Sequence, residues 1–134
     1  MILGLGCDIV QVSRFKRGED FINRFMRKHF TSNEIADIEK RKENLIPENL
    51  ILTVATRFAA KEAVSKALGS GFQNGITLQD IEITHDELGC PHAKLYNQAL
   101  SRAYLISKNQ QFNLHLTLSN EREYVNAVAV IECM

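Results

Sequence analysis

The longest helical pattern in the chain, over residues 50–68, runs into a glycine-rich loop and constrains the fold more than any other segment. Residues 57–72 read RFAAKEAVSKALGSGF. Small apolar side chains recur at helical spacing, which is typical of a helix that packs closely on another element. Gly69 follows the last helical position, as a C-cap glycine does. We therefore expect a fold arranged around one long central helix.

The polar side chains of this helix fall on one face when the residues are placed about 100° apart. They are Arg57, Lys61, Glu62, Ser65 and Lys66. A solvated face with surface ion pairs, worth about 0–1 kcal/mol each, would explain most of them. Phe58 lies in the same face, and a solvated surface does not require a phenylalanine. We therefore expect another element, a neighbouring subunit or a bound ligand to cover it.

The loop after the helix, GSGFQNG, carries three glycines whose backbone amides could turn inward around an anion. It follows the negative end of the helix dipole, which repels phosphate. A phosphate here would need positive charge from Lys61 and Lys66, or from a divalent cation on Glu62. The pattern is not a Walker loop, because GxxxxGK followed by Ser or Thr is absent. Taken alone, the loop is a weak phosphate signal.

Asp8 interrupts the apolar strand LGLGCDIVQV near the N-terminus. A buried aspartate is costly unless it is paired or bound to a metal. It either caps a turn at the end of the strand or joins Glu62 as a Mg²⁺ ligand, which requires the strand and the helix to lie side by side. Gly4 and Gly6 alternate along this strand, so we expect another backbone to pass close to one of its faces.

The remaining patterns contain both strands and helices without a strict alternation, which predicts an α+β fold with an antiparallel sheet on the central helix. A chain of 134 residues indicates one domain over residues 1–134. A capping box at residues 31–34 predicts a helix start, Asn97 is expected to cap a later helix, and Pro47 marks a loop over 44–49. Strands are expected at 2–12, 80–84, 94–96, 112–118 and 124–132, and the other helices at 19–29, 50–68 and 97–108.

Composition excludes several classes of protein. The formal net charge is zero, which argues against a nucleic-acid partner. No apolar run approaches the roughly 20 residues of a membrane span, so no membrane association is expected. The three cysteines form no CxxC motif, so a reducing cytoplasm is expected. Cys90-Pro91-His92 hints at a metal site, but the sequence places no further Cys or His nearby.

Four segments together resemble the holo-[acyl-carrier-protein] synthase family, the small bacterial 4'-phosphopantetheinyl transferases. They are GLGCDIVQVSR, FTSNE, RFAAKEAVSKALGSG, and DIEI followed by a Gly-x-Pro turn. The resemblance covers nearly the whole chain in the right order, and the first and third segments are highly specific in combination. It implies a single-domain transferase fold and a homotrimer with its sites at subunit interfaces.

The resemblance implies Mg²⁺-dependent transfer of 4'-phosphopantetheine from coenzyme A to a serine hydroxyl of an apo acyl carrier protein. Adenosine 3',5'-bisphosphate is the other product. Asp8 and Glu62 would hold the metal, and Lys66 would join them in catalysis. The base that takes the serine proton stays open between Glu62 and a water on the metal. Coenzyme A would contact a set of side chains and loop residues, namely Arg57, Lys61, Ser65, Lys66, Gly69, Gly71 and, at its nucleotide end, Asn120.

Asn120 is a departure from the family, which commonly has Ser-His where this chain has Ser119-Asn120. Asparagine donates hydrogen bonds but cannot become cationic, so the charge of that contact is in doubt.

Residues 11–30 hold six basic and two acidic side chains, an excess of four positive charges in a neutral chain. A solvated helix would explain this excess. So would a docking surface for an acidic carrier protein, in which Arg14, Arg24 and Arg27 are the expected contacts.

Two other functions share part of this pattern. A Mg²⁺-dependent nucleotide diphosphate hydrolase would use the same carboxylates but needs no basic docking surface. A non-catalytic module that binds coenzyme A or a carrier protein would have no need for Asp8 and Glu62.

Overall fold

The computed structural model describes residues 1–42 and 47–134 and has the expected α+β fold. The predicted loop over 44–49 lies partly outside these residues, but from Pro47 onward the chain is already helical, because proline suits the first helical position. The elements are β1 (Ile2–Gln11), η1 (Val12–Phe15), α1 (Glu19–His29), α2 (Ser32–Lys42), α3 (Pro47–Ala67), η2 (Leu78–Asp80), β2 (Ile81–His85), β3 (Pro91–Leu95), α4 (Asn97–Ile106), β4 (Phe112–Asn120) and β5 (Tyr124–Cys133).

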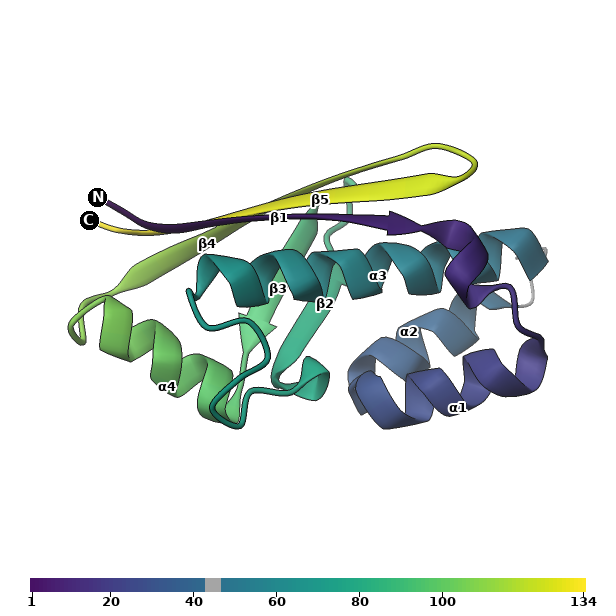
Figure 1. Cartoon of the computed structure of the whole chain (residues 1–134), viewed down its shortest axis with the longest axis horizontal. Coiled ribbons are helices and arrows are strands. Elements are labelled where there is room, and N and C mark those ends of the chain that lie inside the picture. Colours follow the sequence, from purple (N-terminus) through teal and green to yellow (C-terminus); the bar gives the residue numbers. More distant parts are fainter. Residues whose placement is uncertain (43–46) are drawn as a thin grey trace.

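The strands form two antiparallel sheets, one of three strands in the order β1-β5-β4 and one made of the β2-β3 hairpin. The three-stranded sheet lies along one side of α3, as expected (Figure 1). The helices α1 and α2 lie near the N-terminal half of α3, whereas α4 lies beside its C-terminal end (Figure 1). The two chain termini are adjacent, and the Met1 ammonium donates a hydrogen bond to the Cys133 carbonyl at 2.6 Å.

The contact between β1 and α3 is a backbone contact, which confirms the expectation drawn from Gly4 and Gly6. A β-carbon on Gly4 would overlap the carbonyl oxygen of Ala67, and one on Gly6 would overlap that of Ala63. Ala127 and Ala129 of β5 are also fully buried, which keeps the sheet close to the helix. The small residues on both sides therefore fix how near the strand and the helix come to each other.

Phe58 is buried by the chain's own elements. Its ring packs edge-on against Phe15 of η1 at 5.5 Å and against Phe25 of α1 at 5.8 Å between centroids. The guanidinium carbon of Arg14 lies 5.4 Å from the same ring centroid. Of the three covers considered from the sequence, another element is the one found. The idea that a partner chain buries Phe58 is therefore wrong.

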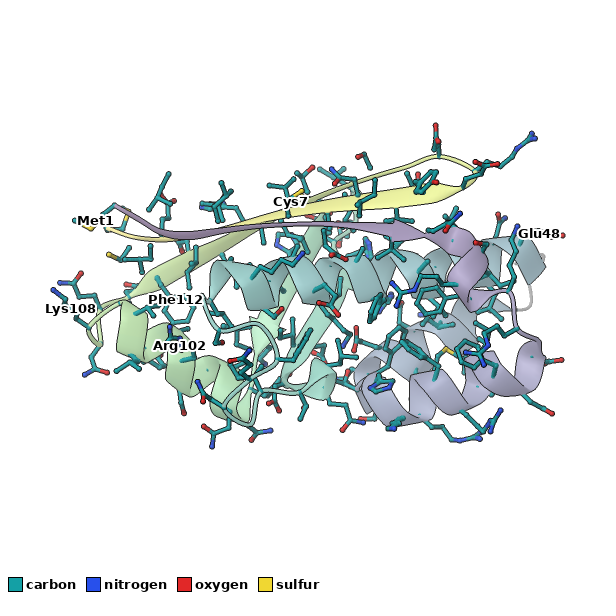
Figure 2. The ribbon with its side chains drawn as sticks, viewed as in Figure 1. Met1, Cys7, Glu48, Arg102, Lys108 and Phe112 are labelled. Atoms are coloured by element: carbon teal, nitrogen blue, oxygen red, sulfur yellow. The ribbon has the colours of Figure 1, made fainter. Side chains whose placement is uncertain are left out.

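No element within residues 1–42 and 47–134 covers the face of the three-stranded sheet opposite α3 (Figure 1). On this face β1 exposes Leu5 at 67% and Ile9 at 66%. Cys7, between them in the same alternation, is also exposed and lies on the side away from α3 (Figure 2). Val128 and Val130 of β5 pair with Cys7 and Leu5 in the strand register, so they extend this apolar strip.

Two local predictions have opposite outcomes. The capping box is confirmed, since the Thr31 amide donates to Glu34 Oε1 at 3.0 Å and the Glu34 amide to Thr31 Oγ1 at 3.2 Å. Asn97 is not the cap of α4, because the N-cap is Tyr96 without a side-chain bond and Asn97 Nδ2 donates to Asp80 Oδ1 instead. Among the described helices, none is both long and apolar enough to cross a bilayer.

Candidate active site

Asp8, Glu62 and Lys66 lie together where β1 crosses α3. Gly4, Gly6 and Asp8 alternate along the strand, so Asp8 points to the same side as the two glycines that touch the helix. The Lys66 ammonium group lies 3.0 Å from Asp8 Oδ1 and donates to the Cys7 carbonyl at 3.0 Å. The strand and the helix therefore lie side by side, which is the condition that a shared metal requires.

Glu62 is half-buried and feels charges of both signs. Burial and the negative charge of Asp8 raise the pKa of Glu62, whereas Lys66 and Arg14 act to lower it. Two nearby carboxylates whose charges disfavour each other form a site that a divalent cation would stabilise. Asp8 and Glu62 thus fit Mg²⁺, which takes one or two protein carboxylates together with substrate oxygens.

The polar groups at the C-terminal end of α3 form hydrogen bonds within the helix and its cap. Ser65 is buried, and its hydroxyl donates to the Glu62 carbonyl at 2.7 Å. The amide of Gly69 donates to the Lys66 carbonyl at 2.9 Å, and that of Gly71 to the Ser65 carbonyl at 3.1 Å. Both glycines have positive φ, as the helix ending requires. These two amides cap the helix, so their proposed contact with coenzyme A stays a prediction.

Lys61 points away from the Asp8 cluster into the interior. Its ammonium group donates to Glu34 Oε1 at 2.6 Å and to the carbonyl oxygens of Leu78 at 2.9 Å and Ile81 at 2.5 Å. Burial lowers the pKa of Lys61, and Glu34 opposes that shift. With these three partners, Lys61 ties α2 and β2 to α3, an arrangement that favours a structural role over the predicted contact with phosphate.

Glu34 is the partner that the sequence did not reveal. It completes the capping box, accepts from Lys61, and accepts from the Ile83 amide at 3.1 Å through its other oxygen. A capping-box glutamate is ordinarily a local feature, so the pattern gave no sign of the long-range contacts. Phe58, on the same helix face as Lys61, was the one available signal that this face is covered.

Arg57 joins the same interior network but leaves one donor free. Its Nη2 lies 2.6 Å from Asp37 Oδ2, and its Nη1 donates to the Ile83 carbonyl at 2.9 Å. Within the described residues, Arg57 Nε and His85 Nδ1 are buried without a hydrogen-bond partner. Both residues line a cavity of about 190 Å³ together with Arg41 and Asn120.

Two arginines line this cavity, and both also pair with Asp37, Arg41 Nε at 3.4 Å from Oδ1 and Arg57 Nη2 at 2.6 Å from Oδ2. Burial and the charges of Arg57 and Arg41 lower the pKa of His85, so that its imidazole resists protonation. Two arginines, an unpartnered guanidinium N–H and an asparagine amide suit an anionic group. Arg41 and His85 were not among the residues selected from the sequence, because no local motif connects them.

The candidate residues thus divide between two places on one chain. Asp8 lies on β1 and Asn120 on β4, the two outer strands of the sheet, with β5 between them. Asp8 pairs with Ala127, whereas Asn120 pairs with Val125. One chain therefore carries a carboxylate cluster at one edge of the sheet and a basic cavity at the other edge.

The basic residues of the N-terminal region lie on η1, on α1 and on the short link between them. Arg24 and Arg27 line a shallow surface hollow with Asp20 and Asn23, and Arg24 Nε donates to the Asp20 carbonyl at 3.3 Å. Arg14, on the preceding turn, is near enough to Glu62 for its charge to act on that carboxyl. The basic surface and the carboxylate cluster are therefore neighbours.

Comparison with known proteins gives a consistent family match. A model of the 4'-phosphopantetheinyl transferase superfamily matches residues 4–129. The holo-[acyl-carrier-protein] synthase of Clostridium beijerinckii is 39% identical over 136 residues, with both chains covered in full. The structure of holo-ACP-synthase from Plasmodium yoelii has a TM-score of 0.80 at 31% identity, covering 98% of this chain and 94% of that one.

A second solved structure was determined with a ligand. The holo-(acyl-carrier-protein) synthase of Bacillus anthracis, in complex with CoA (3',5'-ADP), has a TM-score of 0.76 and 30% identity. It covers 100% of this chain and 99% of its own.

Proposed function

This chain belongs to the 4'-phosphopantetheinyl transferase superfamily, and we propose that it is a holo-[acyl-carrier-protein] synthase. It transfers the 4'-phosphopantetheine group of coenzyme A to a serine hydroxyl of an apo acyl carrier protein. The observation that carries this function is the meeting of Asp8, Glu62 and Lys66 at the contact between β1 and α3. Relatives of full-length similarity bear the same name, and a related structure contains coenzyme A.

The reaction is one phosphoryl substitution. The serine oxygen attacks the phosphorus that carries the pantetheine, the bond from that phosphorus to the bridging diphosphate oxygen breaks, and adenosine 3',5'-bisphosphate leaves. The serine proton passes to a base. Negative charge accumulates on the diphosphate oxygens, so positive charge fixed beside them lowers the barrier.

Asp8 and Glu62 would hold Mg²⁺ in this site, and the ion would supply charge neutralisation on the diphosphate. Lys66, half-exposed and already drawn to Asp8, is placed to bind the same oxygens. The base that takes the serine proton is proposed to be Glu62 or a water on the metal, because both would lie beside the reacting oxygens.

The second half of the site is the basic cavity at Arg57 and Asn120. We propose that it binds the anionic nucleotide end of coenzyme A, because two arginines and the asparagine amide line it. It lies at the opposite edge of the sheet from Asp8, and we propose that a neighbouring copy brings its own cavity beside the carboxylates of this chain. The uncovered apolar strip around Leu5 and Ile9 is a surface that such an association would bury. The homotrimer itself rests on the family resemblance.

The carrier protein is proposed to dock on the basic surface of Arg14, Arg24 and Arg27. This surface adjoins the carboxylate cluster through Arg14, so a docked carrier would present its serine near Glu62. The three cysteines are free, which is compatible with work in a reducing cytoplasm.

One assay tests the function against its alternatives. The protein is incubated with coenzyme A, Mg²⁺ and apo carrier, and the carrier is weighed by mass spectrometry. Gain of one phosphopantetheine group, with adenosine 3',5'-bisphosphate as the other product, is expected. Cleavage of coenzyme A without a change in the carrier would indicate a hydrolase, and binding without chemistry would indicate a non-catalytic module.

A further inference from the structure

The tip of the β2-β3 hairpin gathers three different metal-binding side chains outside the site described above. Asp86, Cys90 and His92 each offer a ligand atom, and these atoms lie within 4.8 Å of one another. Cys90 directly precedes β3 and His92 is its second residue, so the two are separated by one residue, as are side chains on one face of a strand. Asp86 directly follows β2, on the other side of the turn.

The turn holds the aspartate in a fixed orientation. Asp86 Oδ1 accepts the amides of Leu88 and Cys90, both at 2.9 Å. The remaining oxygen, Oδ2, lies 3.1 Å from His92 Nε2. The carboxylate is therefore held by backbone donors on one side and presents its free oxygen to the histidine on the other. Backbone bonds of this kind orient a metal ligand before any metal arrives.

The sequence alone argued against a site here, because no other Cys or His is near Cys90 and His92. The fold supplies a carboxylate in place of the missing partner. A thiolate, an imidazole and a carboxylate are a donor set that Zn²⁺ accepts, and the sulfur ligand disfavours Mg²⁺ and Ca²⁺. A thiolate and a carboxylate with a neutral histidine also match the double charge of the ion.

We infer that Asp86, Cys90 and His92 form a three-ligand site for Zn²⁺ or a similar borderline transition-metal ion, with the fourth position open to solvent. Ligand atoms around tetrahedral zinc are roughly 3.5 Å apart, given bond lengths of about 2.0–2.3 Å. The pair formed by Asp86 and His92 is already within that distance. The widest separation, 4.8 Å at most, has to shorten by roughly 1 Å, a movement within reach of exposed side chains.

The experiment uses Co²⁺ as a spectroscopic probe of the whole protein under reducing conditions. A thiolate bound to Co²⁺ produces a charge-transfer band in the near ultraviolet, whereas carboxylate ligands do not. Metal bound at Asp8 and Glu62 is therefore silent in this measurement. We expect one equivalent of Co²⁺ to produce the band and added Zn²⁺ to abolish it.

Matched variants assign the band to this hairpin. Cys90→Ser should remove it, and Cys7→Ser, which alters another exposed cysteine, should leave it unchanged. Asp86→Asn retains an acceptor for the two backbone amides while losing the charge, and it should weaken Zn²⁺ affinity at least about tenfold in competition with a chromogenic chelator. His92→Ala should weaken it by at least as much, with His115→Ala as its exposed control.

The inference is overturned if the wild-type protein produces no thiolate band with stoichiometric Co²⁺. It is also overturned if the band survives in Cys90→Ser, or if Asp86→Asn and His92→Ala bind Zn²⁺ as tightly as the wild-type protein. Circular dichroism of each variant establishes that the fold is retained, so a lost band reports the lost ligand. None of these outcomes depends on transferase activity.

Discussion

The carbonyl oxygen of Ala63 lies where a β-carbon of residue 6 would have to stand, so that only glycine lets α3 rest on β1 at Gly6. Two residues further along the same face of the strand is Asp8. On the helix, Glu62 directly precedes Ala63, and Lys66 follows Ala63 by about one turn. The close approach at Gly6 therefore determines how far Asp8 lies from its partners on the helix.

Gly6→Ala should destabilise the protein and separate the carboxylates. The new methyl group meets backbone, which cannot rotate away, so the strand must move; overpacking of this kind costs about 1–3 kcal/mol. Urea denaturation measures the loss, and transfer activity should fall in the fraction that remains folded. Cys7→Ala, on the exposed face of the same strand, is the control and should change stability by less than about 0.5 kcal/mol. Equal stability of the two variants would mean that β1 and α3 can move apart at Gly6 without a measurable cost.

Loss of either carboxylate should abolish most transfer. Asp8→Asn and Glu62→Gln each keep the shape of the side chain and replace a charged oxygen by an amide, which is a poor ligand for Mg²⁺. Both variants should retain the wild-type circular dichroism spectrum, because neither residue belongs to the apolar core. Near-normal turnover in either variant at ordinary Mg²⁺ would contradict the proposed metal site.

The local features of this fold could be predicted from the sequence, whereas the long-range ones could not. Gly4 and Gly6 indicated a close backbone, and the capping box at Thr31 and Glu34 indicated a helix start, because each is encoded within a few residues. The polar face of α3 was recognised as one surface. In the structure it is divided, with Lys61 turned inward to Glu34 and Lys66 turned outward to Asp8.

That division depends on where α2 and β2 pack, which no pattern within the helix specifies. The local bond to the Thr31 amide is a sufficient reason for a glutamate at position 34, so the sequence contained no sign that Glu34 also accepts a hydrogen bond from Lys61. The cavity at Arg57 and His85 was missed for the same reason, because residues from four separate elements, α2, α3, β2 and β4, form it.

The raised pKa of Glu62 should make the free energy of unfolding fall as pH rises, and Glu62→Gln should remove that dependence. Its pKa is raised from the ordinary value of 4.5, so the folded protein holds this proton more tightly than the unfolded chain does. The resulting stability is complete below pH 4.5 and is lost as pH rises through the raised pKa. Glu62→Gln does not titrate, so in the absence of divalent cations its stability relative to wild type should increase over that interval.

The measurement is urea denaturation of both proteins between about pH 4 and pH 7, an interval that begins near the ordinary pKa of a glutamate. Curves of unfolding free energy that stay parallel would show that Glu62 is not perturbed. Added Mg²⁺ should stabilise the wild-type protein more than the variant, because binding to the folded state alone shifts the equilibrium.

Arg24→Ala should raise the KM for the carrier protein and leave the KM for coenzyme A nearly unchanged. Arg24 lies on the basic surface of α1, and its charge steers an acidic partner without touching the carboxylate cluster. The effect should diminish at high salt. Lys108→Ala is a matched control, because Lys108 lies just beyond α4, at the opposite end of the molecule from α1 (Figures 1 and 2). Arg14→Ala should act on both KM for the carrier and kcat, because Arg14 also lowers the pKa of Glu62.

Asn120→His restores the family's usual histidine in a cavity that already contains Arg41 and Arg57. Those two arginines lower the pKa of His85, and they should likewise disfavour a charged imidazole at position 120 in the free protein. A bound phosphate reverses that balance, because its negative charge favours the protonated form. Binding of coenzyme A to the variant should therefore take up a proton near pH 6, close to the unperturbed histidine pKa of about 6.5.

The variant should bind coenzyme A more tightly than the wild-type protein at about pH 6 and by a smaller factor at about pH 8, where the imidazole is neutral. A charge-assisted hydrogen bond is worth about 1.5–3 kcal/mol against about 1 kcal/mol for a neutral one, so the gain should not exceed about tenfold in Kd. Isothermal titration at both pH values measures it, and Asn113→His, at the exposed far end of β4, is the control. Because His85 titrates in both proteins, the ratio of their affinities at each pH isolates residue 120. A ratio that stays constant between the two pH values would place the phosphate outside this cavity.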